Sequence, residues 1–436
     1  MSKAVTIIGA GLAGCEAAWQ LAERGIEVKL FEMKPGKMSP AHVSQSFAEL
    51  VCSNSFRGNE LTNAVGLLKE EMRRLGSLII QTADETKIPA GGALAVDREK
   101  FSGLITERIT NHPKIKVIEQ DVSEIPDGKV IIATGPLTSQ KLSARIASIF
   151  PDEEMLNFYD SASPIVTFES IDMTSAFFAS RYDKGDADYI NCPLDKKQYT
   201  DFYEALITAE KASVHGFEEK LVFEGCIPIE VMAKRGEDTI RYGPLKPVGL
   251  KDPKTGKEPY AVVQLRKDNA EGTLYNIVGF QTHLKFPEQK RVFGMIPALS
   301  NADIVRYGVM HRNTYLDSPK LLDRFYRLKT NHNISFAGQI TGVEGYVESA
   351  ASGLLVGIES SFELLGLKPV EFSFETAIGA LAQYISQGSV SDFQPMNINF
   401  GIIAPHRKMK DKRSKNLAIS ERSLNLIDSI AKSLAL

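Results

Sequence analysis

Hydrophobic and polar positions change from strand-like to helix-like spacing at the start of the chain. Residues 5–8 are apolar and β-branched, which predicts a buried strand. After a glycine-rich turn, residues 15–24 carry alanine and leucine at helical spacing. Residues 27–31 form a second strand-like run, which ends at Glu32. The pattern predicts a strand–loop–helix–strand unit over residues 5–32.

The turn inside this unit has a GxGxxG sequence, made of Gly9, Ala10, Gly11, Leu12, Ala13 and Gly14. The first glycine permits the tight turn, the second lets the backbone approach a pyrophosphate, and the third lets the helix pack on the strand. The helix N-terminus offers N–H groups and a partial positive charge to phosphates. Glu32 can accept hydrogen bonds from ribose hydroxyls. We therefore expect the unit to bind the ADP half of a dinucleotide rather than to be a structural turn.

Two later segments favour FAD over NAD as that dinucleotide. Residues 129–136 form an apolar run that ends in Ala-Thr-Gly at Gly135, and residues 334–339 form another that ends at Gly338 and Gln339. Such strands return to the nucleotide in flavoproteins with two dinucleotide domains. A loop then leads to Gly345 and to a predicted helix, whose N-terminus would face a flavin. The middle of the chain has no second GxGxxG of the NAD type.

The sequence pattern changes in the middle of the chain, where short strand-like runs alternate with loops. We predict an α/β fold with a Rossmann-like FAD-binding domain, built from residues 1–162 and 324–436. An α+β substrate domain is inserted at residues 163–323. Its expected elements are strands at 165–168, 260–265 and 275–280 and a helix at 199–212. Further helices are expected at 346–358, 375–385 and 420–434.

Composition adds limits rather than a function. Of the 436 residues, 43% are hydrophobic and 24% are charged, and the net charge is -3, which indicates a globular chain of two or three domains without a preferred partner. No run reaches the roughly 18 uncharged apolar residues of a membrane span. The apolar start is too short and glycine-broken for a signal peptide. We expect a cytoplasmic protein that does not enter membranes.

A basic stretch near the C-terminus departs from this balance. Six of the nine residues 407–415 are lysine or arginine. Such a run is usually a solvated loop. It can also contact phosphates on an otherwise near-neutral protein. Composition does not decide between the two interpretations.

Long motifs in the chain resemble those of the GidA-related flavoproteins. Residues 9–18 are similar to the start of that family. Its smaller branch, the folate- and FAD-dependent tRNA (uracil-5-)-methyltransferases, resembles this chain over nearly its whole length. The segments that carry this resemblance are Leu-Val-Cys-Ser-Asn-Ser-Phe at 50–56, Ile-Pro-Ala-Gly-Gly-Ala-Leu-Ala-Val-Asp-Arg at 88–98, Phe-Glu-Gly-Cys-Ile-Pro-Ile-Glu at 223–230, and the twelve residues 338–349.

The resemblance implies a reaction. Methylenetetrahydrofolate gives its one-carbon unit, by way of FAD, to C5 of the T-loop uridine of tRNA, and NADPH or NADH supplies the reducing equivalents. The same chemistry on a uridine of 23S ribosomal RNA is an alternative. An ordinary flavin oxidoreductase of a small molecule, or a non-catalytic FAD-containing RNA-binding protein, would also use the fold. The preferred nicotinamide nucleotide and the oligomeric state stay open.

The four cysteines are widely spaced and contain no CxxC pair, which predicts neither a disulfide framework nor a metal site. By resemblance, Cys226 and Cys52 are catalytic. Thiolate addition at C6 of uracil activates C5, and a base must then remove the C5 proton. We assign Cys226 as nucleophile and Cys52 as base or partner thiol, although the roles could be exchanged. Cys15 and Cys192 are expected to be small buried side chains.

Substrate contacts are the last expectation. His311, Arg312 and Asn313 follow one another near the flavin-binding segments, and His311 could stack on a pterin or be a surface histidine. Arg407 and Lys408 could hold a folate glutamate tail or an RNA phosphate. Both ligands are anionic, so charge does not separate them.

Overall fold

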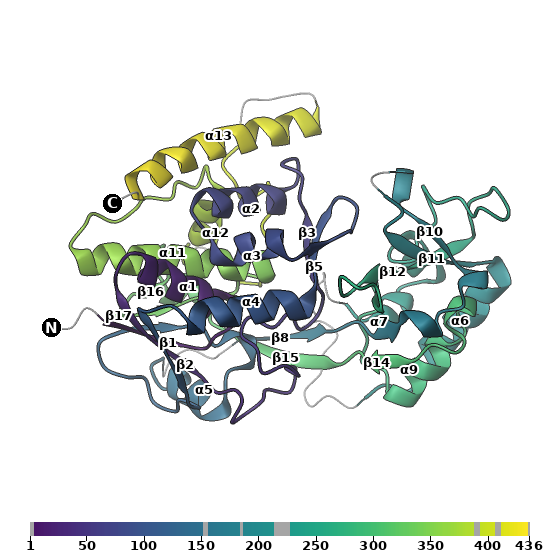
Figure 1. The fold of residues 1–436 in the computed structure, drawn as a ribbon, viewed down its shortest axis with the longest axis horizontal. Coiled ribbons are helices and arrows are strands. Elements are labelled where there is room, and N and C mark those ends of the chain that lie inside the picture. The colour runs from purple at the N-terminus through teal and green to yellow at the C-terminus, as the bar shows by residue number, and fades with distance from the viewer. Residues whose placement is uncertain are drawn as a thin grey trace.

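The structure is a computed structural model, which describes residues 4–150, 156–183, 186–212, 227–387, 393–405 and 411–434. At positions 157–160, 183, 311 and 312 only the backbone is described. The chain forms two bodies joined by a narrow connection (Figure 1). The larger body contains both ends of the described chain, and the smaller one contains the middle.

A six-stranded sheet forms the centre of the larger body, and its strands come from both ends of the chain. In spatial order they are β16 (Arg327–Leu328), β17 (Asn331–Phe336), β7 (Lys129–Ile132), β1 (Ala4–Ile8), β2 (Glu27–Glu32) and β6 (Ile115–Glu119). All neighbours pair in parallel except β16, which is antiparallel to β17. Val5, Ile7 and Ile131 are fully buried, as expected for parallel strands covered on both faces.

Two helices with small side chains pack closely over this sheet. They are α1 (Leu12–Glu23) and α11 (Tyr346–Leu365). A Cβ atom on Gly353 would lie 2.2 Å from the carbonyl oxygen of Ala13, and one on Gly357 would lie 2.9 Å from that of Ala17. Glycine at these positions therefore lets the first and the late helix touch, which joins the two ends of the chain.

The remaining helices of the larger body surround this pair, and a small sheet lies at the edge that faces the second body (Figure 1). The helices are α2 (Ala64–Arg74), α3 (Leu78–Glu85), α4 (Arg98–Thr110), α5 (Gln140–Ala147), α10 (Ser318–Leu321), α12 (Ala377–Ser386) and α13 (Lys412–Leu434). The small sheet has the order β3 (Ser55–Gly58), β5 (Ala93–Val96) and β4 (Lys87–Ile88). α13 packs along α2 at the outer surface.

The smaller body has its own core around an antiparallel sheet. The strand order is β10 (Phe177–Ala179), β11 (Tyr189–Leu194), β12 (Ala261–Lys267), β13 (Leu274–Ile277), β9 (Ile165–Thr167) and β14 (Ile304–Arg306). The helices are α6 (Lys196–Thr208), α7 (Ile229–Ala233), α8 (Glu237–Tyr242) and α9 (Phe286–Phe293). The α/β fold class with an inserted α+β unit is confirmed.

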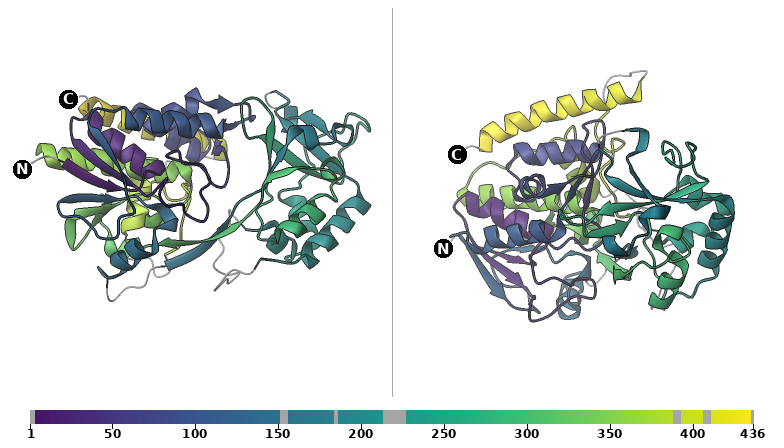
Figure 2. Two further views of the ribbon diagram at one scale, coloured as in Figure 1. Left: turned by 60° about the horizontal axis from the view of Figure 1, so that its bottom comes forward. Right: turned by 45° about the vertical axis from the view of Figure 1, so that its right-hand side comes forward.

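A two-stranded ribbon carries the chain between the bodies. β8 (Leu156–Ser161) leads out and β15 (Met310–Tyr315) leads back, and they pair antiparallel from Leu156–Tyr315 to Ser161–Met310. Figure 2 shows the ribbon running from the larger body to the smaller one. Within the described ranges, no helix has the length and apolar character to cross a membrane.

The final helix differs from the sequence expectation. It begins at Lys412, eight residues before the predicted start at 420. The last part of the basic stretch, residues 412–415, is therefore helical, which differs from the solvated loop that was one of its two open interpretations. The first part, which includes Arg407 and Lys408, lies outside the described residues.

Candidate dinucleotide and thiol site

The glycine turn between β1 and α1 leaves space on one side only. Gly9 has a φ of +102°, and its N–H donates to the carbonyl of Phe31 at 2.8 Å. A Cβ on Gly14 would lie 1.8 Å from the Gly9 carbonyl oxygen. Among the described residues, a Cβ on Gly11 would meet no heavy atom within 4 Å. The open position is the one at which a pyrophosphate would approach the backbone.

Glu32 lies at the end of β2 beside this turn and is only 7% exposed. One carboxylate oxygen accepts the N–H of Ala10 at 2.7 Å, and the other accepts the N–H of Lys34 at 3.0 Å. These bonds fix the carboxylate next to the open face of the turn. Each oxygen keeps a further lone pair for a ribose hydroxyl, so the residues present fit an adenine dinucleotide.

The two predicted return loops meet at the same edge of the sheet. The 3₁₀ turns η1 (Gly135–Leu137) and η8 (Gln339–Thr341) contact each other and both contact β15. Gly135 and Gly338 have φ values of +67° and +85°, which favour glycine. The Gly338 N–H donates to Ser352 Oγ on α11 at 2.7 Å. The loops after β7 and β17 therefore lie together at the ends of their strands, beside the glycine turn.

A tyrosine at the N-terminus of α11 forms hydrogen bonds with the backbone at Cys52. Gly345, with a φ of +109°, precedes this helix, and Tyr346 is its first residue. The Tyr346 hydroxyl oxygen accepts the N–H groups of Cys52 at 2.7 Å and Ser53 at 3.1 Å. Burial raises the pKa of Tyr346, and the nearby Cys52 raises it further. The structure thus brings Cys52 to the helix end at which Gly345 was expected to meet a flavin.

Arg98 holds the segment just before this cysteine. Its guanidinium donates to the carbonyl oxygens of Leu50 and Val51, and it forms a bidentate pair with Asp268 of the smaller body at 2.8 and 3.1 Å. Burial opposes the charge of Arg98, but the Asp268 carboxylate outweighs burial and raises the pKa of the guanidinium. A retained positive charge therefore lies beside the Cys52 segment.

The other predicted residues have different placements. Cys226 lies outside the described residues, as do Arg407 and Lys408. His311, Arg312 and Asn313 lie on β15, which contacts both return loops, and the Asn313 side chain is buried. Only the backbone of His311 and Arg312 is described.

Cys15 and Cys192 are fully buried, as expected. The Cys15 thiol donates to the Ala10 carbonyl at 3.3 Å. Burial raises the pKa of both thiols, so neither is suited to act as a nucleophile. Among the cysteines that the structure describes, Cys52 is therefore the one whose position suits a reactive thiol.

Sequence reasoning did not assign roles to Tyr346, Arg98 and Asp268. Tyr346 lies in the motif at residues 338–349, and Arg98 lies in the motif at residues 88–98. Their position in these motifs is the sequence feature that could have marked them as functional residues. Asp268 stands outside every motif. Only the folded chain shows that it lies against Arg98.

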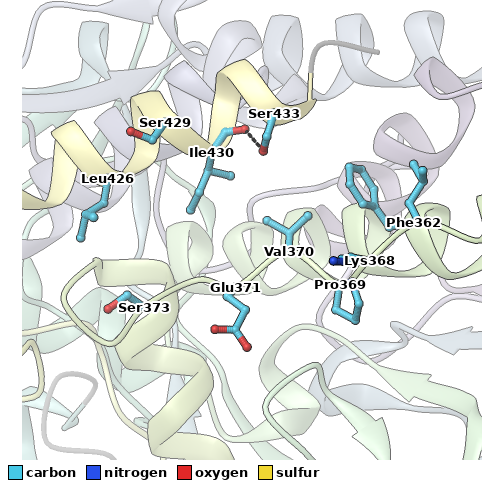
Figure 3. A pocket seen from close by; sticks show the side chains of 11 residues that line it. Phe362, Lys368, Pro369, Val370, Glu371, Ser373, Leu426, Ser429, Ile430 and Ser433 are labelled. Atoms are coloured by element: carbon cyan, nitrogen blue, oxygen red, sulfur yellow. Dashed lines mark hydrogen bonds between the residues drawn. The ribbon is translucent and has the colours of Figure 1, made fainter.

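A groove at the outer surface lies away from this site. It has a volume of about 590 Å³ and runs between α13, the C-terminal end of α11 and the segment 367–373. Figure 3 shows Ile430 of α13 facing Val370 across it. It contains none of the predicted site residues. Phe362 at its rim is about 24 Å along α11 from Tyr346, at 1.5 Å per residue.

The fold and the site define a Rossmann-type dinucleotide-binding protein with an inserted domain and a cysteine hydrogen-bonded to the first residue of α11. The family model described as glucose inhibited division protein A matches residues 4–368, and the chain belongs to this family. A solved structure of Aquifex aeolicus GidA has a TM-score of 0.71, with 15% identity, and the match covers 99% of this chain and 73% of that one. That likeness supports the fold.

Curated relatives give the particular branch. A protein of Acetivibrio thermocellus is 61% identical over 425 residues, which are 97% of each chain. One of Listeria monocytogenes serotype 4b is 58% identical over 435 residues, with 100% of both chains covered. Both are named methylenetetrahydrofolate--tRNA-(uracil-5-)-methyltransferase TrmFO.

Proposed function

We propose that this protein transfers the one-carbon unit of 5,10-methylenetetrahydrofolate to C5 of the T-loop uridine of tRNA, with FAD as cofactor and NADPH or NADH as reductant. The observation that carries the proposal is the position of Cys52 beside the N-terminus of α11. The chain is also 61% identical to the Acetivibrio thermocellus protein that is named as such a methyltransferase. The substrates, tRNA and folate, are soluble, and we place the reaction in the cytoplasm.

The residues that would hold FAD come from three loops. The turn 9–14 and Glu32 would hold the ADP half, and Gly135, Gly338, Gln339 and Gly345 would approach the remainder. When bound, FAD supplies the redox chemistry and carries the one-carbon unit. The division into residues 1–162, 163–323 and 324–436 stays part of the proposal.

The two thiols perform complementary steps on the base. C5 of uracil is a poor nucleophile. Addition of the Cys226 thiolate to C6 converts the ring to an enolate, whose C5 can form the new carbon–carbon bond. Cys52 then accepts the C5 proton as the carbon separates from the group that carried it. Two electrons from the reductant, delivered as hydride, would complete the methyl group while the Cys226 sulfur leaves and the C5–C6 double bond is restored. The guanidinium of Arg98 favours an anionic sulfur at Cys52, as this role requires.

The remaining expected contacts belong to the substrates. His311, Arg312 and Asn313 on β15 would face the folate beside the return loops. Arg407 and Lys408 would contact a folate glutamate tail or an RNA phosphate.

A T-stem-loop RNA with 5-fluorouridine at the target position tests the assignment. Fluorine cannot leave C5 as a cation, so the thiol adduct persists. We expect a covalent protein–RNA complex on a denaturing gel, which disappears in Cys226→Ala and persists in Cys15→Ala as control. An adduct that is lost in Cys52→Ala but not in Cys226→Ala would exchange the two roles.

The RNA target is tested separately. Transcripts of tRNA and of 23S ribosomal RNA are incubated with labelled methylenetetrahydrofolate, and label in the tRNA alone is expected. Label in the ribosomal transcript would move the same chemistry to that RNA. Consumption of folate and NADPH without any RNA product would contradict the proposal and favour an oxidoreductase that acts on a small molecule.

A further inference from the structure

The segment that follows Cys52 is held by the smaller body. Arg266, at the end of β12, donates from Nη2 to Ser53 Oγ at 2.7 Å and from Nε to Asn54 Oδ1 at 3.1 Å. The Asn54 amide in turn donates to the carbonyl of Lys267 at 2.9 Å. Asn54 is fully buried. Two consecutive residues after the cysteine are therefore fixed by a strand more than 200 positions away.

The charge of Arg266 is not explained by these partners. Arg266 is 8% exposed, and its hydrogen-bond partners, the side chains of Ser53, Asn54 and Tyr189, are neutral. Over the parts of the chain that the structure describes, no carboxylate forms an ion pair with it, since Asp268 is engaged by Arg98. Burial lowers the pKa of Arg266, which measures the cost of keeping a cation there.

Arg98 and Arg266 hold opposite sides of the same short segment. Arg98 binds the carbonyls of residues 50 and 51, and Arg266 binds the side chains of residues 53 and 54. Two guanidinium groups thus share one aspartate, Asp268, and the charge of Arg98 interacts directly with Cys52. A sulfur anion at this cysteine is the group that such a charge would stabilise.

We propose that Arg266 is a positioning residue for Cys52. From the inserted domain it fixes Ser53 and Asn54, so that the thiol is correctly directed only when that domain is seated against the larger body. This inference rests on the proposed role of Cys52 as an active thiol. It makes the reactivity of a residue in the FAD-binding domain depend on a strand of the substrate domain.

The test measures the thiol directly in the full-length, flavin-loaded protein. The rate of Cys52 alkylation by iodoacetamide is followed by mass spectrometry of its peptide between pH 6 and 10. In Arg266→Ala we expect alkylation at neutral pH to be slower by about tenfold and the profile to move to higher pH, because thiolate character is lost. We expect kcat for methyl transfer to fall by about tenfold or more with little change in KM for RNA.

Three further variants separate positioning from loosening of the interface. Arg266→Lys keeps the charge without the two-pronged geometry and should recover part of the alkylation rate. Ser53→Ala removes one acceptor of Arg266 and should slow alkylation less than Arg266→Ala. Lys100→Ala breaks the exposed Lys100–Glu271 pair across the same interface and should leave both readouts unchanged.

The outcomes are distinct. Alkylation that is unchanged or faster in Arg266→Ala, or an equal effect in Lys100→Ala, overturns the positioning role. A slower and shifted alkylation profile supports it even if methyl transfer to RNA is never detected, because the thiol readout needs no RNA. Failure of methyl transfer in the wild-type protein would count against the proposed function alone.

Discussion

At the scale of single residues, different glycines of the turn serve folding and cofactor binding. Gly14 is surrounded by backbone, whereas Gly11 faces space that the described residues leave open. The backbone at Gly11 has a φ of -75°, which alanine adopts without strain. A methyl group at these two positions should therefore have different consequences.

The first prediction uses this pair. Gly11→Ala should fold with an unchanged melting temperature but bind FAD at least about tenfold more weakly, because its methyl group occupies the pyrophosphate path. Gly14→Ala should lower the melting temperature of the apoprotein, because its Cβ would overlap the Gly9 carbonyl. Calorimetry and flavin titration measure both. Wild-type FAD affinity in Gly11→Ala would contradict the placement of the cofactor.

The second prediction concerns Glu32. Glu32→Ala removes the acceptor of the Ala10 and Lys34 amides and the carboxylate available to a ribose. The purified variant should retain a smaller fraction of flavin than the wild type, as read from the ratio of visible to ultraviolet absorbance. Glu27→Ala, at the exposed start of the same strand, is the control. Equal flavin content in all three proteins would argue against the dinucleotide assignment.

At the scale of elements, a buried acid joins three helices. Glu71 on α2 accepts the N–H groups of Ala377 at 2.7 Å and Ile378 at 2.9 Å, which begin α12, and the hydroxyl of Ser423 on α13. Burial raises its pKa from 4.5 to about 7, against the opposing effect of these hydrogen bonds. The folded state therefore holds this proton more tightly than the unfolded chain does.

The third prediction is a pH dependence with a defined sign. The stabilisation from protonated Glu71 is complete below pH 4.5 and is lost as the pH rises through about 7. The stability of the wild type relative to Glu71→Gln should fall by about 3 kcal/mol between pH 4.5 and 8, at 1.36 kcal/mol per pKa unit. Urea unfolding at both pH values measures this difference. The surface variant Glu421→Gln should show no such change.

Elements were predictable where the chain itself carries the signal. The apolar runs that became β1, β7 and β17 specify buried strands without further information. The start of α13 was missed because its first turns are polar. Asp411 accepts the N–H of Ser414 at 2.7 Å, and Asn416 donates to the carbonyl of Thr62 at 3.1 Å. The second contact joins distant segments, which periodicity does not reveal.

The surroundings of Cys52 were hidden for the same reason. The motif identified the cysteine, but Tyr346 contacts it from 294 residues away, and Arg266 contacts the next residue, Ser53, from 213 residues away. Such contacts depend on how the two bodies meet. A sequence indicates which residues carry chemistry more readily than which residues hold them in place.

At the scale of the whole molecule, the two bodies meet through charged groups of unequal burial. The side chains of Arg98 and Asp268 are 10% and 4% exposed. Those of Lys100 and Glu271, across the same interface, are both more than half exposed. Water screens the second pair but not the first.

The fourth prediction compares these pairs. Asp268→Ala should destabilise the protein by about 3–5 kcal/mol, because it leaves the buried Arg98 guanidinium without its carboxylate. Glu271→Ala should have little or no effect. Unfolding followed by calorimetry, together with protease sensitivity of the ribbon, gives the comparison. Similar small effects in both variants would mean that Arg98–Asp268 does not hold the bodies together.

The paired ribbon β8–β15 has an evolutionary consequence. Because Ser161 lies opposite Met310, the chain leaves and re-enters the larger body through neighbouring positions. Residues 162–309 thus form a cassette whose removal would need only a short hairpin turn to rejoin the strands. Exchange of that cassette would leave the six-stranded sheet intact, but a replacement would have to supply a new carboxylate for Arg98 in place of Asp268.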